Sequence, residues 1–391
     1  MIMKLPLIVV TIAFGASVTA QSFQQLVDSR NSANPYSSVL QIEAGAIGAF
    51  SSSSDASAEL RGLEDTISWD GHVYYRDEEF GSRRSTVEAY GGRDGVFTSF
   101  QDGQLIGDDT VTRFEFRARP WMFYRDGYYE DGELRQNGFF EGSDYETYVG
   151  FGRAAQDGLY IELGPYYGIH EFRSSQLTFP NYKLPEDYAT YGARVYLEQR
   201  AVQMDRRRGM PQQGFVLTVL GEREWNDSTA AFGTEDIFET RLPNDAWRAR
   251  MRLEWYIPAS DSATWEIFAR GGMQADKDRI QNIEGQRPLG NQWGEGQVRL
   301  RFHLGQWITV TPFANVQYSR TPKQNGLGSS KDFFLGGGAE TYVHLGESLS
   351  VHAFYSFIDN ENRPSVSINE DLRGQHMAYV GMVLRLGAAR R

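Results

Sequence analysis

Residues 246–257 read AWRARMRLEWYI, and this stretch decides the fold class. Apolar side chains occupy one parity from Trp247 to Ile257, whereas Arg248, Arg250, Arg252 and Glu254 occupy the other. Successive side chains of a β-strand leave opposite faces, so a period of two predicts a strand. The alternation outlasts the roughly 5–6 residues of a typical soluble strand. It matches a tilted membrane strand of about 9–11 residues, whose apolar row ends in interfacial aromatics.

The same alternation recurs along almost the whole chain. Strands are predicted at 39–50, 66–77, 84–91, 95–101, 110–124, 145–153, 158–170, 187–200, 213–225, 244–257, 262–274, 292–303, 306–319, 332–345, 348–358 and 376–388. The pair 84–91 and 95–101 is alternatively one strand bent around a glycine-rich joint. We therefore predict an all-β, transmembrane, antiparallel up-and-down barrel of about 16 strands, with 14 as the lower bound.

The lengths of the joints give an independent argument. Short joints are predicted at 154–157, 258–261, 304–305 and 346–347. Long joints are predicted at 125–144, 171–186, 226–243, 275–291, 320–331 and 359–375. The short joints follow even strands and the long ones follow odd strands, as in outer-membrane barrels with short periplasmic turns. A secreted β-sandwich, the main alternative, gives no reason for this phase.

The composition excludes several other classes. A chain of 391 residues with 14% aromatics carries too much apolar surface to remain disordered. The absence of cysteine excludes a disulfide scaffold, a thiolate zinc site and a cysteine nucleophile. A formal net charge of −12 argues against a nucleic-acid partner, because phosphate contacts need a basic face. The mean hydropathy of −0.49 fits a barrel, since every second strand residue faces a polar lumen.

The N-terminus predicts export. One positive charge precedes an apolar run from Leu5 to Ala16, and small residues then lead to an expected cleavage after Ala20. The alternative, a membrane anchor, is disfavoured because the run is too short to span roughly 30 Å of hydrocarbon. We expect a signal peptide at 1–20, a short periplasmic segment at 21–38 and the barrel at 39–391, placed in the outer membrane of a Gram-negative bacterium.

The second half carries several motifs in a fixed order. They are the segment from Asp205 to Leu217 with its Pro-x-x-Gly, the charged strand from Arg248 to Pro258, the strand from Trp265 to Gly272, the pair Glu295–Phe302 and Thr311–Tyr318, and the glycine-rich strand from Phe334 to Tyr342. Together, residues 205–388 resemble the barrels of the bacterial surface antigen family, of the BamA/TamA type. The resemblance implies a role in outer-membrane biogenesis, in the handling of proteins or lipids.

Two features of that family differ here. Its loop between strands eleven and twelve usually carries an Arg-Gly-Phe/Tyr motif, and the nearest candidate for the arginine in this chain is Arg287. The expected periplasmic segment of about 18 residues has no room for POTRA domains.

Charged residues recur on the inward parity of neighbouring strands. The arginines among them are Arg113, Arg117, Arg119, Arg194, Arg200, Arg248, Arg250, Arg252, Arg299 and Arg301, and the carboxylates are Glu115, Glu162, Glu198, Glu254 and Glu340. A ring of arginines would make an anion-attracting pore wall. Cross-strand ladders of arginine and carboxylate, which fill the lumen and pair the charges, are the preferred interpretation.

Enzymatic function is not expected. The six histidines are scattered as lone residues, at His72, His170, His303, His344, His352 and His376. A hydrolase would need a histidine poised beside a nucleophile and an orienting partner. His303 and His344 are able to approach each other across strands, as hydrogen-bonded lumen residues. We expect no catalytic residue, no metal site and no cofactor.

Two functions follow from these patterns. The first is a non-enzymatic barrel in outer-membrane biogenesis, and the alternative is a passive porin-like channel or structural barrel with an arginine-rich lumen. The expected partners are outer-membrane lipids, the barrel assembly machinery during insertion, and small solutes or client proteins, without nucleic acid.

Overall fold

The computed structural model describes a barrel wall and a small sheet beside it. It describes residues 36–51, 66–82, 84–92, 95–107, 110–130, 133–155, 158–175, 178–205, 210–228, 230–234, 238–241, 244–274, 291–322, 329–346, 348–358 and 375–389. The strands of the wall are β1 (Tyr36–Ser51), β2 (Thr66–Asp77), β3 (Ser85–Gly92), β4 (Gly95–Asp102), β5 (Val111–Glu130), β6 (Glu133–Ala154), β7 (Leu159–Arg173), β9 (Tyr188–Asp205), β10 (Met210–Asn226), β13 (Asp245–Ser260), β14 (Ala263–Gln274), β15 (Gln292–Leu304), β16 (Ile308–Pro322), β17 (Ser329–His344), β18 (Leu349–Ile358) and β19 (Gln375–Ala389).

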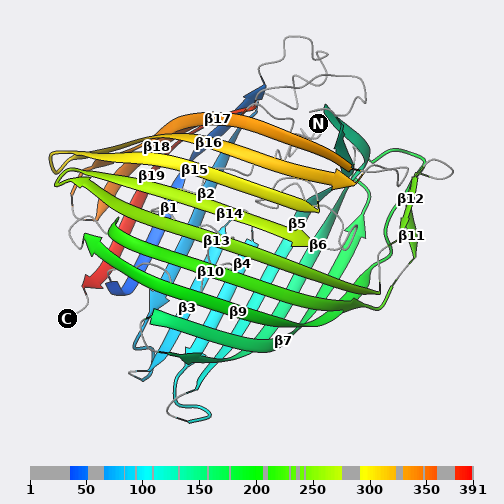
Figure 1. The fold of residues 1–391 in the computed structure, drawn as a ribbon, viewed down its shortest axis with the longest axis horizontal. Helices are drawn as coiled ribbons and strands as arrows, with labels where there is room; N and C mark the ends of the chain where they lie inside the picture. The colour runs from blue at the N-terminus through cyan, green and yellow to red at the C-terminus, as the bar shows by residue number, and fades with distance from the viewer. Residues whose placement is uncertain are drawn as a thin grey trace, which may run out of the picture.

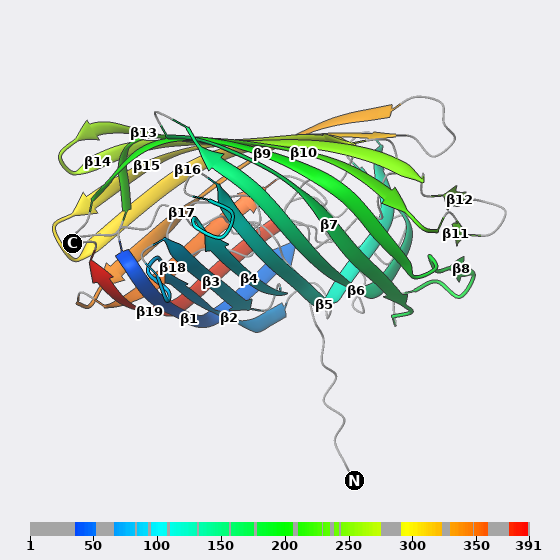
Figure 2. The ribbon, with the colours of Figure 1, turned by 90° about the horizontal axis from the view of Figure 1, so that it is seen from below.

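These sixteen strands form one closed antiparallel barrel (Figures 1 and 2). Each strand pairs with its neighbour in the chain, and β1 pairs with β19 from Tyr36↔Ala389 to Ser51↔Gln375. The predicted fold class is confirmed, and each of the sixteen predicted strands corresponds to one strand of the wall. The joint at 93–94 separates two strands, β3 and β4, so the single bent strand is wrong.

The predicted loop at 125–144 is wrong. The segment 125–144 was expected to be a long irregular loop, but β5 continues to Glu130 and β6 begins at Glu133. The two strands pair almost to their ends, from Val111↔Gly152 to Glu130↔Glu133, with two register shifts. β5 and β6 are the two longest strands of the wall, and β5 comes close to β16 and β17 on the opposite side of the barrel.

A second, small sheet lies in segments that were predicted to be loops. It contains β8 (Tyr182–Lys183), β11 (Ala231–Thr234) and β12 (Phe238–Arg241), in the order β12-β11-β8. Four buried aromatic side chains pack together beneath it: Phe140, Tyr182, Tyr188 and Phe232. The β7–β9 and β10–β13 connections therefore have an apolar core of their own.

The two ends of the barrel differ as expected. The pairing of Tyr36 with Ala389 places the start of β1 and the end of β19 at the same end. This end also carries short connections, at 155–158, 206–209, 261–262, 305–307 and 345–348, whereas the two-residue joints 93–94 and 131–132 lie at the other end. The long connections, at 52–65, 174–187, 227–244, 275–291 and 359–374, are at the other end. We call them the short-turn end and the long-loop end.

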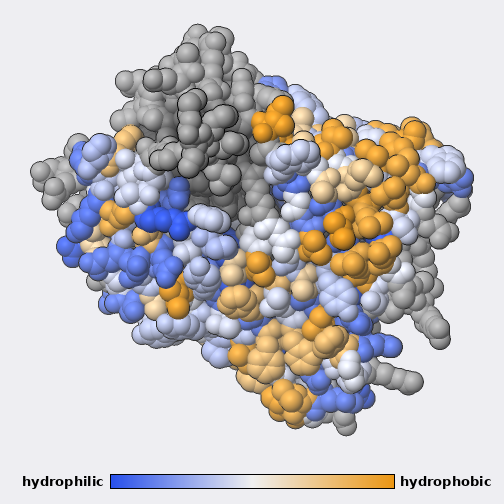
Figure 3. Space-filling view, turned by 180° about the vertical axis from the view of Figure 1, so that it is seen from behind, coloured by the Kyte–Doolittle hydropathy of each residue, from blue (hydrophilic) through white to orange (hydrophobic). Residues whose placement is uncertain are grey.

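The two faces of the wall have opposite polarity. The outer face carries large exposed apolar side chains on every part of the wall, among them Leu163, Trp247, Met251, Trp265 and Val380. Figure 3 shows apolar patches on the face of the molecule that lies behind in Figure 1. The inner face carries buried polar and charged side chains instead. This inversion of the usual pattern is what a lipid-facing wall around a polar interior requires.

No helix in the described part of the chain is long and apolar enough to cross a membrane.

The start of β10 shows why the Pro-x-x-Gly motif fits here. Gly214 has a φ of 109°, and a Cβ atom there would lie 1.8 Å from the carbonyl oxygen of Ala201. The register between β9 and β10 shifts between Pro211 and Gln213, beside this glycine. Glycine tolerates both the positive φ and the close backbone approach. The bulge redirects the start of β10, and the buried Met210 packs against Tyr342 and Val383 of the opposite wall.

Candidate functional site

The inward rows of six adjacent strands carry a group of neighbouring ion pairs. We call it the lumen network and define it by six arginines and six carboxylates: Arg113, Arg117, Arg119, Arg194, Arg248, Arg250, Glu115, Asp144, Glu146, Glu162, Glu222 and Glu224. These residues come from β5, β6, β7, β9, β10 and β13. Equal numbers of opposite charges make the network electrically neutral when all members are ionised.

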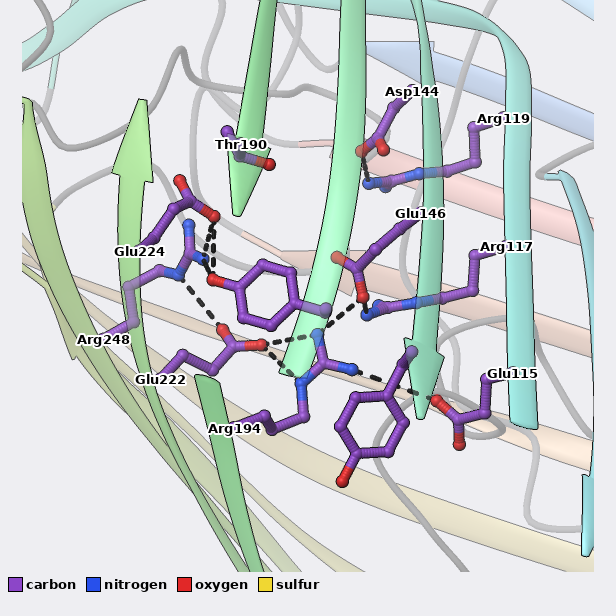
Figure 4. Close-up of polar contacts among 12 residues, drawn as sticks. Glu115, Arg117, Arg119, Asp144, Glu146, Thr190, Arg194, Glu222, Glu224 and Arg248 are labelled. Atoms are coloured by element: carbon purple, nitrogen blue, oxygen red, sulfur yellow. Dashed lines mark hydrogen bonds and ion pairs between the residues drawn. The ribbon is translucent and has the colours of Figure 1, made fainter. Parts of the chain in front are cut away.

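Arg194 is the centre of the network (Figure 4). Its guanidinium donates to Glu146 Oε1 and to Glu222 Oε1, each at 2.7 Å, and lies 3.9 Å from Glu115 Oε2. The rings of Tyr148 and Tyr166 flank it, with centroids 5.0 and 4.9 Å from its Cζ atom. Two hydrogen-bonded carboxylates and two aromatic faces hold this guanidinium in one position, since arginine has five fixed donors and favours aromatic stacking.

Arg248 extends the network toward the long-loop end. It donates to Glu222 Oε2 at 3.1 Å and to Glu224 Oε2 at 2.8 Å. Tyr166 donates its hydroxyl to the same Glu224 oxygen at 2.9 Å, from a strand two places away from β10 around the wall. Arg250 adds a third bond to Glu222, at 3.0 Å. Glu222 thus accepts from three arginines.

The strand β5 supplies three further arginines of the lumen network. Arg117 pairs with Glu146, and Arg119 pairs with Asp144 at 2.6 Å (Figure 4). Arg113 donates to Glu162 Oε2 at 3.1 Å. Glu162 also accepts the hydroxyls of Tyr148 and Tyr160, so this fully buried carboxylate has three donors.

A second group of charges lies on the opposite wall. Arg299 and Arg301 approach Glu266 to 3.1 and 2.8 Å, and Arg299 also pairs with Glu340. His352 bridges Glu340 at 3.0 Å and Glu43 at 2.7 Å. Arg301 also donates to the carbonyl oxygen of Pro211, which ties β15 to the redirected start of β10.

Most of the wall residues predicted from the sequence lie on the inner face in ion pairs. Arg113, Arg117, Arg194, Arg248 and Arg250 belong to the lumen network together with Glu115 and Glu162, whereas Arg299, Arg301 and Glu340 belong to the opposite group. Arg252 and Glu254 pair with each other along β13 at 2.5 Å. Arg287, Ala20 and most of the segment 21–38 lie outside the described residues.

Sequence reasoning missed most of the partners. Asp144, Glu146, Glu222, Glu224, Glu266 and Glu43 were not singled out, although they share the inward parity of their strands. Which carboxylate meets which arginine depends on the register between strands, and the register is fixed by the fold. The signal that could have found them is the parity itself, extended to every carboxylate of each strand.

Two of the histidines meet through a hydroxyl. His303 Nδ1 lies 3.1 Å from Thr309 Oγ1, and His344 Nε2 lies 3.2 Å from the same oxygen. His344 Nδ1 lies 3.0 Å from Ser350 Oγ. This chain of hydrogen bonds fits the hydrogen-bonded lumen histidines that the sequence suggested.

The burial of the lumen network decides what it can do chemically. Arg113 is 2% exposed, Arg194 is 2% exposed and Glu162 is 0% exposed. Side chains that line an open aqueous pore stay in contact with water, whereas these side chains are packed against their neighbours and shielded from it. Because each arginine of the network has a carboxylate partner, the network also lacks the excess positive charge that an anion-selective wall requires.

Comparison with known proteins finds similar structures but no match to a family model or a curated sequence. No family model and no curated protein matches the sequence. Among solved structures, the chain is similar to CdiB from Acinetobacter baumannii, with 10% identity and a TM-score of 0.52 over 89% of this chain and 60% of that one. It is also similar to BamA from Haemophilus ducreyi lacking POTRA domains 1–3, with 9% identity and a TM-score of 0.53 over 89% of this chain and 70% of that one.

The barrel is similar to those of CdiB and BamA. The resemblance read from residues 205–388 is thereby confirmed at the level of the fold, and it extends over most of the chain. The chain spans less than two thirds of the CdiB chain that it matches.

Proposed function

We propose that this protein is a non-enzymatic barrel of the bacterial outer membrane that handles proteins or lipids there, and that it does not act as a passive pore. The observation that carries the proposal is the neutral, buried lumen network around Arg194. An anion-selective channel needs a wall with excess positive charge in contact with water, whereas these charges are paired and buried.

The closed outer face supports the location. Every strand of the barrel has its backbone paired with two neighbours over part of its length, and the outer row is apolar. Only closed barrels and helices satisfy the backbone in lipid. The similarity to BamA and CdiB supports a barrel of the assembly or transport type, because those barrels have the same architecture.

Deletion of the gene in its host tests the role. The expected result is a changed outer membrane, with reduced amounts of integral barrel proteins or increased phospholipid at the cell surface. Complementation with Arg194→Ala should fail if the packed network is required, whereas the outer-face variant Arg223→Ala should restore the wild-type membrane. A deletion strain with unchanged barrel proteins and unchanged lipid asymmetry would contradict the proposal.

The alternative of a porin-like channel gives a different result in the same strain. Loss of a channel slows the uptake of small solutes and leaves the protein and lipid content of the membrane unchanged. Uptake of a small sugar or amino acid, measured beside the membrane composition, therefore separates the two functions.

A further inference from the structure

The wall of the barrel has a low section at β3 and β4. Each of these strands has eight residues, whereas β2 has 12 and β5 has 20. Eight residues at about 3.4 Å rise and about 40° tilt cover about 21 Å, against an apolar band of about 25 Å. The β3–β4 hairpin therefore ends below the top of the neighbouring strands, on the side of the long-loop end.

The strand pairing shows the gap directly. Pairing between β2 and β3 stops at His72↔Gly92, so no described strand pairs with that edge of residues 66–71 of β2. Pairing between β4 and β5 stops at Val96↔Ala118, so the corresponding edge of β5 has no described strand partner from Arg119 onward. In the wall order β2-β3-β4-β5, the opening above the short hairpin lies between residues 66–71 of β2 and the part of β5 from Arg119 onward. We call this opening the wall notch.

The base of the hairpin exposes apolar side chains. The connections that enter β3 and leave β4 expose three large apolar side chains, Phe80, Leu105 and Ile106. Such side chains at a turn fit the boundary between water and lipid. A hairpin that starts there and is too short for the apolar band must end inside the band, in its long-loop half.

The flanks of the notch are unusually apolar and open. Trp69 and Ile67 on β2 are 85% and 81% exposed, the highest values among the large apolar side chains of the described chain. A Cβ atom on Gly91, at the tip of β3, would meet no atom within 4 Å. On the inner side, Arg119 pairs with Asp144 beside the notch.

We propose that the wall notch is a lateral binding site for a lipid of the leaflet at the long-loop end. One acyl chain lies against Trp69 and Ile67, and the polar part of the lipid reaches the inner face near Arg119. Lipid is the occupant because the notch opens through the apolar outer face, where lipid is the surrounding medium, and because edges that no described strand pairs need a polar partner in hydrocarbon. The site deepens the proposed function by naming lipid as the substrate, but its test measures access alone and needs no biological activity.

The absence of cysteine from the chain allows a direct test with single-cysteine variants. Asp70→Cys places a bimane fluorophore on the inner parity of β2 beside the notch. Thr190→Cys is the matched control, since Thr190 is 1% exposed on the inner parity of β9, where the neighbouring strands are long. Leu163→Cys, on the outer face of β7, is the lipid-facing reference. Each labelled barrel is reconstituted in vesicles of phosphatidylcholine with or without bromine midway along the acyl chain.

The proposal predicts that brominated lipid quenches the label at position 70 to a degree similar to the reference at position 163, and leaves the label at position 190 unquenched. Gly91→Cys should also be quenched, because the tip of the hairpin lies within the band. Lengthening β3 and β4 by an alternating insertion between Gly92 and Gly95 should remove the quenching at position 70 alone.

Two results would overturn the lateral site. One is a label at position 70 that brominated lipid quenches no more than the label at position 190. The other is a label at Gly91→Cys that only a water-soluble quencher reaches, because the hairpin tip would then lie outside the apolar band. Neither result bears on whether deletion of the gene disturbs the membrane, so a failed site and a failed function are distinguishable.

Discussion

Replacement of Arg194 by methionine tests the lumen network at its centre. Methionine keeps the length and the apolar stem of the side chain but removes both hydrogen-bonded ion pairs, to Glu146 and to Glu222. Removal of one partner of a buried ion pair costs about 3–5 kcal/mol, because the remaining charge stays buried without compensation. Glu146 keeps Arg117, and Glu222 keeps Arg248 and Arg250. The expected loss is therefore at the lower end, about 3 kcal/mol.

The assay is reversible unfolding by guanidinium chloride in phospholipid vesicles, followed by tryptophan fluorescence. The matched control is Arg223→Met, which breaks an arginine–aspartate pair on the outer face. There the side chain of Arg223 is 61% exposed and that of Asp245 is 44% exposed. Exposed pairs contribute about 0–1 kcal/mol, so the control should lose less than the network variant.

A double-mutant cycle measures the coupling energy between Arg194 and Glu222. Arg194→Met and Glu222→Gln are measured alone and together, and residues of one charged network couple by about 0.5–3 kcal/mol. A free energy of unfolding for Arg194→Met within about 0.5 kcal/mol of the wild type would refute the reasoning, since surface substitutions give values of that size. A coupling energy of zero would show that the two side chains do not interact in the membrane.

Two further predictions use the same unfolding assay. Gly214→Ala should lower the free energy of unfolding by about 1–3 kcal/mol or more, because the φ of 109° is strained for alanine and its Cβ would overlap a backbone carbonyl. Gly221→Ala is the control, since its Cβ has no atom within 4 Å, and its stability should stay near that of the wild type. Equal effects of the two alanines would contradict the bulge. Met210→Ala should lose about 2 kcal/mol, since it empties a buried contact with the opposite wall, and the half-exposed, lipid-facing Met251→Ala should lose less. A larger loss at Met251 would contradict the packing at the start of β10.

The strands of the wall could be predicted from the sequence because each strand has one face toward lipid and the other toward the lumen, and the residue types on the two faces differ. Along residues 246–257, lipid selects one parity and the lumen selects the other, so the pattern in one strand is independent of its neighbours. The elements that were missed lack this constraint. From Pro120 to the end of β5, and in the part of β6 that pairs with it, the residues do not alternate between apolar and polar. β8 is two residues long and is too short to show an alternating pattern.

The arginines of the candidate site could be predicted from the sequence, but most of their carboxylate partners could not. Arg194, Arg248 and Arg113 are recognisable as inward arginines from the parity of single strands. Their partners are not, because Arg194 meets Glu222 through the register of β9 on β10 and meets Glu146 across β7. The same limit applies to the wall notch, which follows from the lengths of four strands relative to one another.

Conductance of the purified protein in a planar lipid bilayer tests the packed lumen most directly. A neutral and buried network predicts no steady ohmic steps for the wild-type protein, and it predicts that Arg194→Ala, which removes the central side chain, introduces them. Regular conductance steps of the wild-type protein, with preference for anions, would contradict the packed lumen and would favour a passive channel with an arginine-lined wall.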